Sequence, residues 1–61
     1  MTQPSISDRA FLAEIDYAGG AKRAYKTAQT DRLTGLGLIR WGGQYDGTAY
    51  LTRAGELALR H

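Results

Sequence analysis

Apolar residues in the first third of the chain recur with a helical period, and polar side chains occupy the positions between them. Four of them share one helical face: Phe11, Leu12, Ile15 and Ala18. The pair Gly19-Gly20 ends the pattern, because glycine readily adopts the left-handed conformation that follows a helix. We therefore expect a helix over residues 8–18. Either Ser7 caps it, or Ser5 does so with Asp8 in the S-x-x-D spacing.

Residues 21–36 contain no proline and no glycine before Gly35, and they separate into two faces on a helical wheel. The small apolar face comprises Ala21, Ala24, Tyr25, Ala28 and Leu36. The basic and polar face comprises Lys22, Arg23, Lys26, Thr27 and Thr30. This pattern predicts one basic amphipathic helix over about 21–34. Arg32 and Leu33 do not fit it, so a second interpretation breaks the helix near Gln29-Thr30. Thr30 then caps a short helix, whose Leu33 and Leu36 pack inward.

The helical period gives way to alternation after Gly37. Residues 38–41 and 48–52 predict two strands joined by a glycine-rich turn. Pairing Ile39 with Leu51 and Trp41 with Ala49 places the apolar residues on one face, which makes Trp41 a core residue. This register leaves residues 44–46 as a three-residue loop.

Thr52 is positioned to cap a last helix over about 53–60, with Leu57 facing inward and Leu59 exposed. We expect residues 1–6 to form a flexible arm and residues 7–61 to form one domain. A chain of 61 residues is too short for a second core, since such a chain buries only about 60% of its surface on folding. The expected fold class is α+β, mostly α.

Charge is distributed unevenly along the chain, whose formal net charge is +2 and whose pI is about 9.3. The first predicted helix has more acidic than basic residues, whereas the second carries four basic residues and one acidic residue. Such a division is typical of a protein that turns one face toward a polyanion.

Candidate chemistry is sparse. The chain has no cysteine, and its one histidine is the last residue, His61. Its six carboxylates show no spacing that suggests acid–base or metal chemistry. No stretch approaches the ~18 apolar residues of a membrane span, and the first residues lack the pattern of a signal peptide. We therefore expect a cytoplasmic protein that is not an enzyme, with no catalytic residues, metal, cofactor or membrane partner.

Two segments together resemble the second half of winged helix-turn-helix DNA-binding domains. The first is Leu33-x-x-Leu36-Gly37-Leu38-Ile39, and the second, after a turn-rich hairpin, is Tyr50-Leu51-Thr52-x-x-Gly55. The resemblance covers about residues 30–58 and implies a compact winged helix with the order helix, helix, hairpin wing, helix. Winged helix-turn-helix domains normally fit two helices and a tight turn into the interval before the Gly37-Leu38-Ile39 step. Only sixteen residues separate Gly20 from Gly37 here, so the resemblance implies a shortened helix-turn-helix.

The resemblance implies a small regulator of transcription that binds double-stranded DNA, of the kind found in phages and bacteria. The basic helix would lie in the major groove while the wing contacts the backbone. The expected contacts are Lys22, Arg23, Lys26, Thr27, Thr30, Arg40, Gln44 and Tyr45. For Arg40, a cation–π pair with Tyr50 on the protein's own surface is an equal alternative.

A protein-interaction module on the same scaffold is the alternative function. The net charge of +2 is low for a monomer that binds DNA tightly. A homodimer would double the phosphate contacts, and Leu57 with Leu59 is the expected dimer surface.

Overall fold

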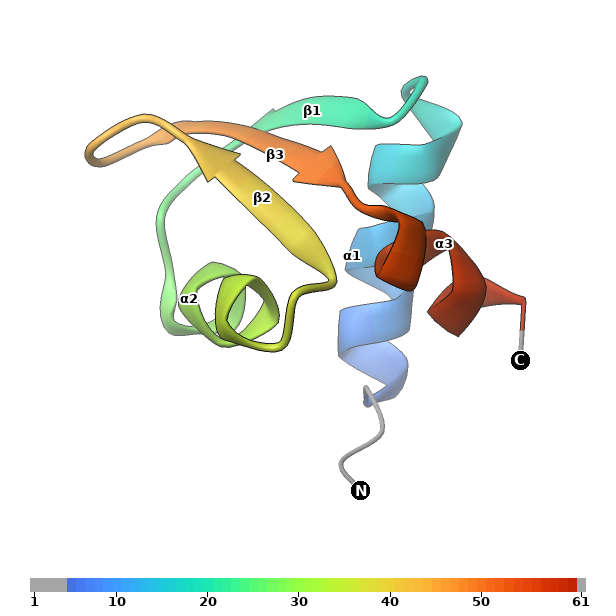
Figure 1. Ribbon diagram of the computed structural model, residues 1–61. Helices are drawn as coiled ribbons and strands as arrows, with labels where there is room; N and C mark the ends of the chain where they lie inside the picture. Colours follow the sequence, from blue (N-terminus) through green and yellow to red (C-terminus); the bar gives the residue numbers. More distant parts are fainter. Residues whose placement is uncertain (1–4, 61) are drawn as a thin grey trace.

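The molecule consists of a three-stranded sheet with helices packed against one of its faces (Figure 1). The computed structural model describes residues 5–60. Its elements are α1 (Ile6–Tyr17), β1 (Ala21–Ala24), α2 (Ala28–Gly35), β2 (Ile39–Gly42), β3 (Gly47–Leu51) and α3 (Arg53–Leu59). Helices α1 and α2 lie beneath the sheet, and α3 packs beside α1. The α+β class with more helix than strand is as expected.

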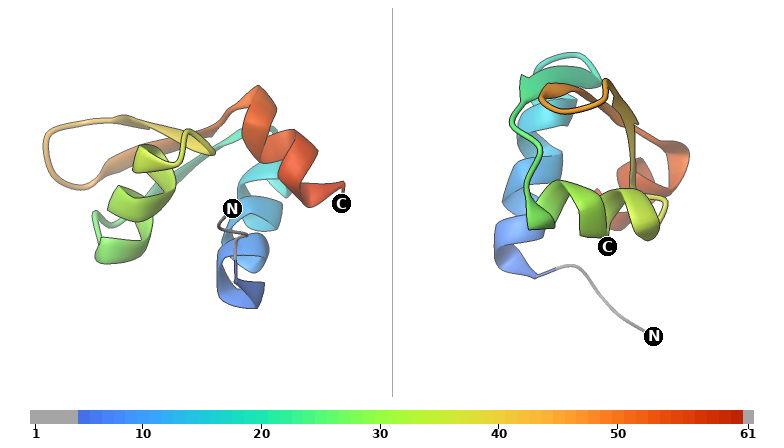
Figure 2. Two further views of the ribbon diagram at one scale, coloured as in Figure 1. Left: turned by 60° about the horizontal axis from the view of Figure 1, so that its bottom comes forward. Right: turned by 90° about the vertical axis from the view of Figure 1, so that its left-hand side faces the viewer.

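The predicted hairpin is present with its predicted register. Ile39 pairs with Leu51, and Trp41 pairs with Ala49. Because β2 extends to Gly42 and β3 begins at Gly47, the connecting loop has four residues, 43–46, rather than the three that we expected. We call the hairpin Ile39–Leu51 the wing. Figure 2 shows it projecting beyond the helices.

The predicted basic helix over 21–34 is wrong. Residues 21–24 form strand β1, which pairs antiparallel with β3 and makes β3 the central strand. Gly19 and Gly20 both have positive φ values, 94° and 98°, and reverse the chain after α1. The Leu51 N–H then donates to the Gly20 carbonyl at 2.8 Å. Pairing with β3 supplies backbone hydrogen bonds that override the high helical propensity of Ala, Lys and Arg in this segment.

The starts of both N-terminal helices are set by capping boxes. Ser5, not Ser7, caps α1: its hydroxyl accepts from the Asp8 N–H, and the Asp8 carboxylate accepts from the Ser5 N–H. Helix α1 therefore begins at Ile6, inside the segment 1–6 that we expected to be an arm. Residues 1–4 lie outside the described part of the chain. Thr27, not Thr30, caps α2, and Thr30 completes its box.

One small core lies between the sheet and the helices. Its buried members are Leu12, Ile15, Leu33, Ile39 and Ala49. Trp41 packs against this core but is only half-buried, and its indole N–H donates to the Tyr45 carbonyl at 2.8 Å. Leu33 is inward, as the second interpretation of this segment predicted, but Leu36 is exposed.

The expected orientation of α3 is reversed. Leu57 is 43% exposed, whereas Leu59 packs against the core. The dimer surface that we expected from Leu57 and Leu59 therefore loses one of its two residues.

The two segments that carry the family resemblance are in contact with each other. The Thr52 hydroxyl donates to the Gly37 carbonyl at 2.6 Å and, as predicted, caps α3 by accepting from the Gly55 N–H. The Thr52 N–H also donates to the Leu38 carbonyl. Gly55 is buried, and a Cβ there would overlap the Leu38 carbonyl oxygen and lie 2.7 Å from Leu51 Cδ1. These residues thus join α3 to the start of the wing.

Within residues 5–60, no helix has the length and apolar character needed to cross a membrane.

The contact at Gly55 predicts the stability of a matched pair of glycine variants. Gly55→Ala forces a methyl group into the Leu38 carbonyl and is expected to lower the free energy of unfolding by about 1–3 kcal/mol. At Gly35, also helical, a Cβ would meet nothing within 4 Å, so Gly35→Ala should leave stability unchanged or raise it by up to about 1 kcal/mol. Thermal and urea unfolding followed by circular dichroism measures both. Equal stability of the two variants would contradict the packing of α3.

Candidate nucleic-acid interface

The face of the sheet that points away from the helices is cationic. Paired residues in antiparallel strands point to the same side, so the register assigns six residues to this face: Ala21, Arg23, Arg40, Gly42, Thr48 and Tyr50. We call this the outer sheet face. Arg23 and Arg40 are both exposed, and none of the six positions carries a carboxylate.

Tyr50 lies at the centre of this face. It pairs with Arg40 on one side and with Ala21 on the other, and it is 45% exposed. Its ring leans across β2 at Gly42, where an added Cβ would come within 2.9 Å of Tyr50 Cε2. Because Gly42 has no side chain, the Tyr50 ring can occupy the space next to it.

Lys22 and Lys26, two of the expected DNA contacts, have carboxylate partners. Lys22 is on the helix side of β1, where its Nζ lies 2.7 Å from Glu14 Oε1 of α1. Lys26 follows β1, and its ammonium group pairs with Asp31 of α2. Both ion pairs are exposed and so contribute little stability, but they neutralise two of the expected cations.

Thr27 and Thr30 also use their side chains in hydrogen bonds within the protein. Thr27 is the exposed cap of α2. Thr30 is only 2% exposed, and its hydroxyl donates to the Thr27 carbonyl at 2.9 Å. Thr30 therefore cannot reach a base edge in this conformation, and we remove it from the candidate interface.

Gln44 and Tyr45 stay available in the loop at the tip of the wing, where both are exposed. The neighbouring Asp46 carboxylate accepts from the Lys26 N–H at 3.0 Å and so ties the wing to the segment after β1. Beside this contact, Arg23, Ala24, Tyr25 and Asp46 line a hollow of about 260 Å³. The wing tip thus adjoins the outer sheet face, and the Asp46 carboxylate lies in the same hollow as Arg23.

The surface of α2 is poorly suited to an anion. Its charged residues are Asp31 and Arg32, and Arg32 is drawn away to α1, where its Nη2 donates to Asp8 Oδ1. This contact explains why Arg32 did not fit the helical wheel. The helix therefore carries no net charge toward solvent.

Asp8 is the buried centre of this contact, with 3% exposure. The Gln29 side-chain amide donates to the same oxygen at 3.0 Å, and the Ser5 N–H donates to the other oxygen at 3.3 Å. The pKa of Asp8 lies below its ordinary value of 3.8, chiefly because of the Gln29 hydrogen bond. Arg32 and Ser5 lower the pKa further, while burial opposes them. Asp8 therefore stays ionised and fixes α2 to the start of α1.

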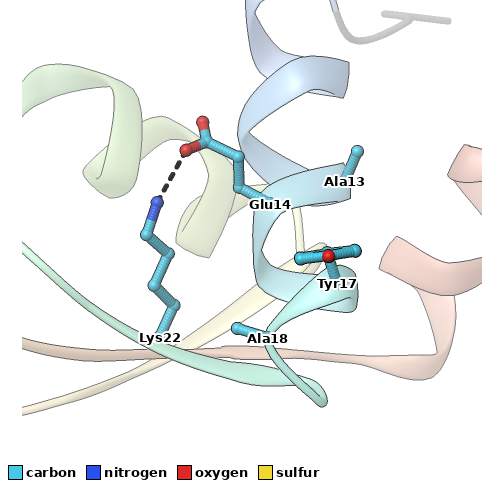
Figure 3. A pocket seen from close by; sticks show the side chains of 5 residues that line it. All are labelled: Ala13, Glu14, Tyr17, Ala18 and Lys22. Atoms are coloured by element: carbon cyan, nitrogen blue, oxygen red, sulfur yellow. Dashed lines mark hydrogen bonds and ion pairs between the residues drawn. The ribbon is translucent and has the colours of Figure 1, made fainter.

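A second hollow lies on the opposite flank, at the end of α1 (Figure 3). It has a volume of about 480 Å³ and is lined by Ala13, Glu14, Tyr17, Ala18 and Lys22. Tyr17 is 96% exposed. The Glu14–Lys22 ion pair spans one side of the hollow, and the Tyr17 ring and two alanines line the rest (Figure 3).

Comparisons with known proteins found no match to a family model, a curated protein or a solved structure. Among residues 5–60, no group of three or more histidine, cysteine, aspartate or glutamate side chains is placed to hold a metal ion.

The sequence predicts correctly that Arg40 and Tyr50 share one face of the hairpin. It does not predict that strand β1 extends this face and adds Arg23 to it. The sequence pattern predicts a helix at Arg23 and gives no role to Thr48, which pairs with Arg23 in the sheet. Two signals pointed to the strand: Gly19-Gly20 turns the chain, and the Thr27–Thr30 spacing starts a helix only later.

The lowered pKa of Asp8 predicts a pH-dependent contribution to stability. Ionised Asp8 stabilises the fold at and above its ordinary pKa, and this contribution is lost as pH falls through the lowered value. Asp8→Asn should cost about 1.5–3 kcal/mol at neutral pH, the range for hydrogen bonds to charged groups. The difference from wild type should shrink below about pH 4. Urea unfolding across the pH range measures it.

Asp16→Asn is the control for this experiment. Asp16 is an exposed carboxylate on the same helix, so its variant should stay within about 0.5 kcal/mol of wild type. A constant difference between wild type and Asp8→Asn from neutral to acid pH would refute the role of ionised Asp8.

Proposed function

We propose that this domain binds nucleic acid through the outer sheet face and the wing. The observation that carries the proposal is the pair Arg23 and Arg40, two exposed cations on a face without a carboxylate. In contrast, Lys22, Lys26 and Arg32 are each paired with an acid. Arginine guanidinium groups suit phosphate because they donate two parallel hydrogen bonds.

The order of elements supports a reduced winged helix. Helix, strand, helix, hairpin and helix follow one another, and the second wing strand lies at the centre of the sheet. The single eight-residue α2 stands where the resemblance implies two helices and a turn. Since α2 has no net charge and its arginine is held by Asp8, we assign the contact to the sheet and wing rather than to a helix in the major groove.

Double-stranded DNA is the ligand that the sequence predicts, and phosphate contacts by Arg23 and Arg40 suit it without reading bases. Gln44 and Tyr45, both exposed at the wing tip, would extend the contact along the backbone. A role in transcription regulation stays a prediction.

The test is a salt titration of a labelled mixed-sequence duplex, followed by fluorescence anisotropy. The wild-type affinity should fall steeply with salt, because binding releases counterions from the phosphates. In the double variant Arg23→Gln/Arg40→Gln, affinity should fall at every salt concentration. The slope of log affinity against log salt should decrease by about one unit for each contact removed.

The control is the double variant Arg9→Gln/Arg60→Gln, which removes the same charge from helix α1 and from the C-cap of α3, outside the outer sheet face. It should bind nearly as wild type does. Equal losses in the two double variants would show that net charge alone matters. No salt-dependent binding by the folded wild type would refute the proposal.

A protein-interaction module is the second candidate, favoured by the hollow beside Tyr17. An exposed aromatic ring next to small apolar side chains suits a protein partner. Binding of such a partner should be weakened by Tyr17→Ala and be insensitive to Arg23→Gln/Arg40→Gln.

A further inference from the structure

The outer sheet face carries an exposed aromatic ring between its two arginines, which phosphate binding alone does not explain. We infer that Tyr50 stacks on an unpaired base, and that the preferred ligand is therefore single-stranded nucleic acid. This inference rests on the proposed function, because it names the class of nucleic acid that the same face takes.

The neighbours of Tyr50 leave its ring open. Ala21 beside it on β1 is small, and Gly42, over which the ring leans, has no side chain. The remaining neighbour in the same row is Arg40. Tyr50 is thus held at a fixed place on the central strand, while nearly half of its surface is free to contact a ligand.

The two arginines lie on opposite sides of this ring. Arg23 is on β1 and Arg40 is on β2, with β3 between them, and they are offset by one row of the sheet. Ideal strand spacing and rise place their Cα atoms roughly 12 Å apart. A single strand crossing the sheet can therefore place phosphates near both guanidinium groups while a base between them rests on Tyr50. Aromatic rings within a cationic path are the general means of binding single strands.

A duplex cannot use this arrangement fully. Its bases are paired and stacked, so their faces are closed to a protein side chain. The major groove admits a helix or a two-stranded ribbon, whereas this face is three strands wide, with β3 flanked on both sides. Laid face-on against a duplex, the sheet reaches phosphates only, and Tyr50 then has no base to contact.

The experiment compares a labelled oligothymidylate of about twelve nucleotides, within the site sizes of known single-strand binders, with the same strand annealed to its complement. Tyr50→Val removes the ring and keeps a residue that favours strands. It should weaken single-strand binding by about five- to 150-fold, which corresponds to the usual range for one stacked base. Tyr50→Phe keeps the ring and should bind as wild type does.

Tyr17→Leu is the matched control, since it removes an exposed tyrosine from α1, outside the outer sheet face. It should bind as wild type does. Circular dichroism verifies that each variant is folded, and Tyr50→Thr replaces Tyr50→Val if that variant unfolds.

Tighter binding of the single strand than of the duplex, lost in Tyr50→Val alone, supports the inference. Equal or tighter binding of the duplex, or wild-type binding by Tyr50→Val, overturns the inference but leaves phosphate binding by Arg23 and Arg40 in place. If neither ligand binds, both the inference and the proposed function are wrong.

Discussion

The pairing of β1 with β3 is the interaction on which the surface of this protein depends. It makes β3 a central strand and places consecutive basic residues on opposite sides of the sheet. Lys22 points toward the helices, where Glu14 neutralises it, and Arg23 points to solvent. In a helix, the two would have lain on one continuous basic face. The strand instead pairs Lys22 with an acid of the fold and leaves Arg23 exposed on the outer sheet face, where we propose that it contacts nucleic acid.

Arg32, like Lys22, is paired with an acidic residue of the fold. Asp8, held near the N-terminus of α1 by its capping box, accepts from Gln29 and Arg32 of α2. This contact fixes α2 against α1 and uses the arginine of α2. The arginines of the outer sheet face have no such partner among the described residues. In a domain with a net charge of only +2, Arg23 and Arg40 lie on a face whose six positions include no carboxylate.

The motif that resembles winged-helix domains has a structural explanation here. Thr52 bonds to the Gly37 carbonyl and caps α3, and Gly55 allows α3 to approach the Leu38 carbonyl closely. These residues join the last helix to the base of the wing, and none of them lies on the outer sheet face. The motif therefore supports the architecture and not a binding surface. The proposed binding of nucleic acid depends instead on Arg23, Arg40 and Tyr50.

The sequence by itself determined the features whose causes are local. The period of α1, the alternation of the wing, its register and the Thr52 cap all depend on residues near one another in the chain, and all were predicted. Only the tertiary structure decided the secondary structure of residues 21–36. These residues have the pattern of a basic helix, yet β1 forms because β3, more than twenty residues away, supplies its hydrogen bonds. The direction of Arg32 depends likewise on Asp8 of another helix. Helical periodicity shows which residues would share a face if the segment were a helix. Contacts with residues distant in the sequence decide whether the segment forms that helix or a strand.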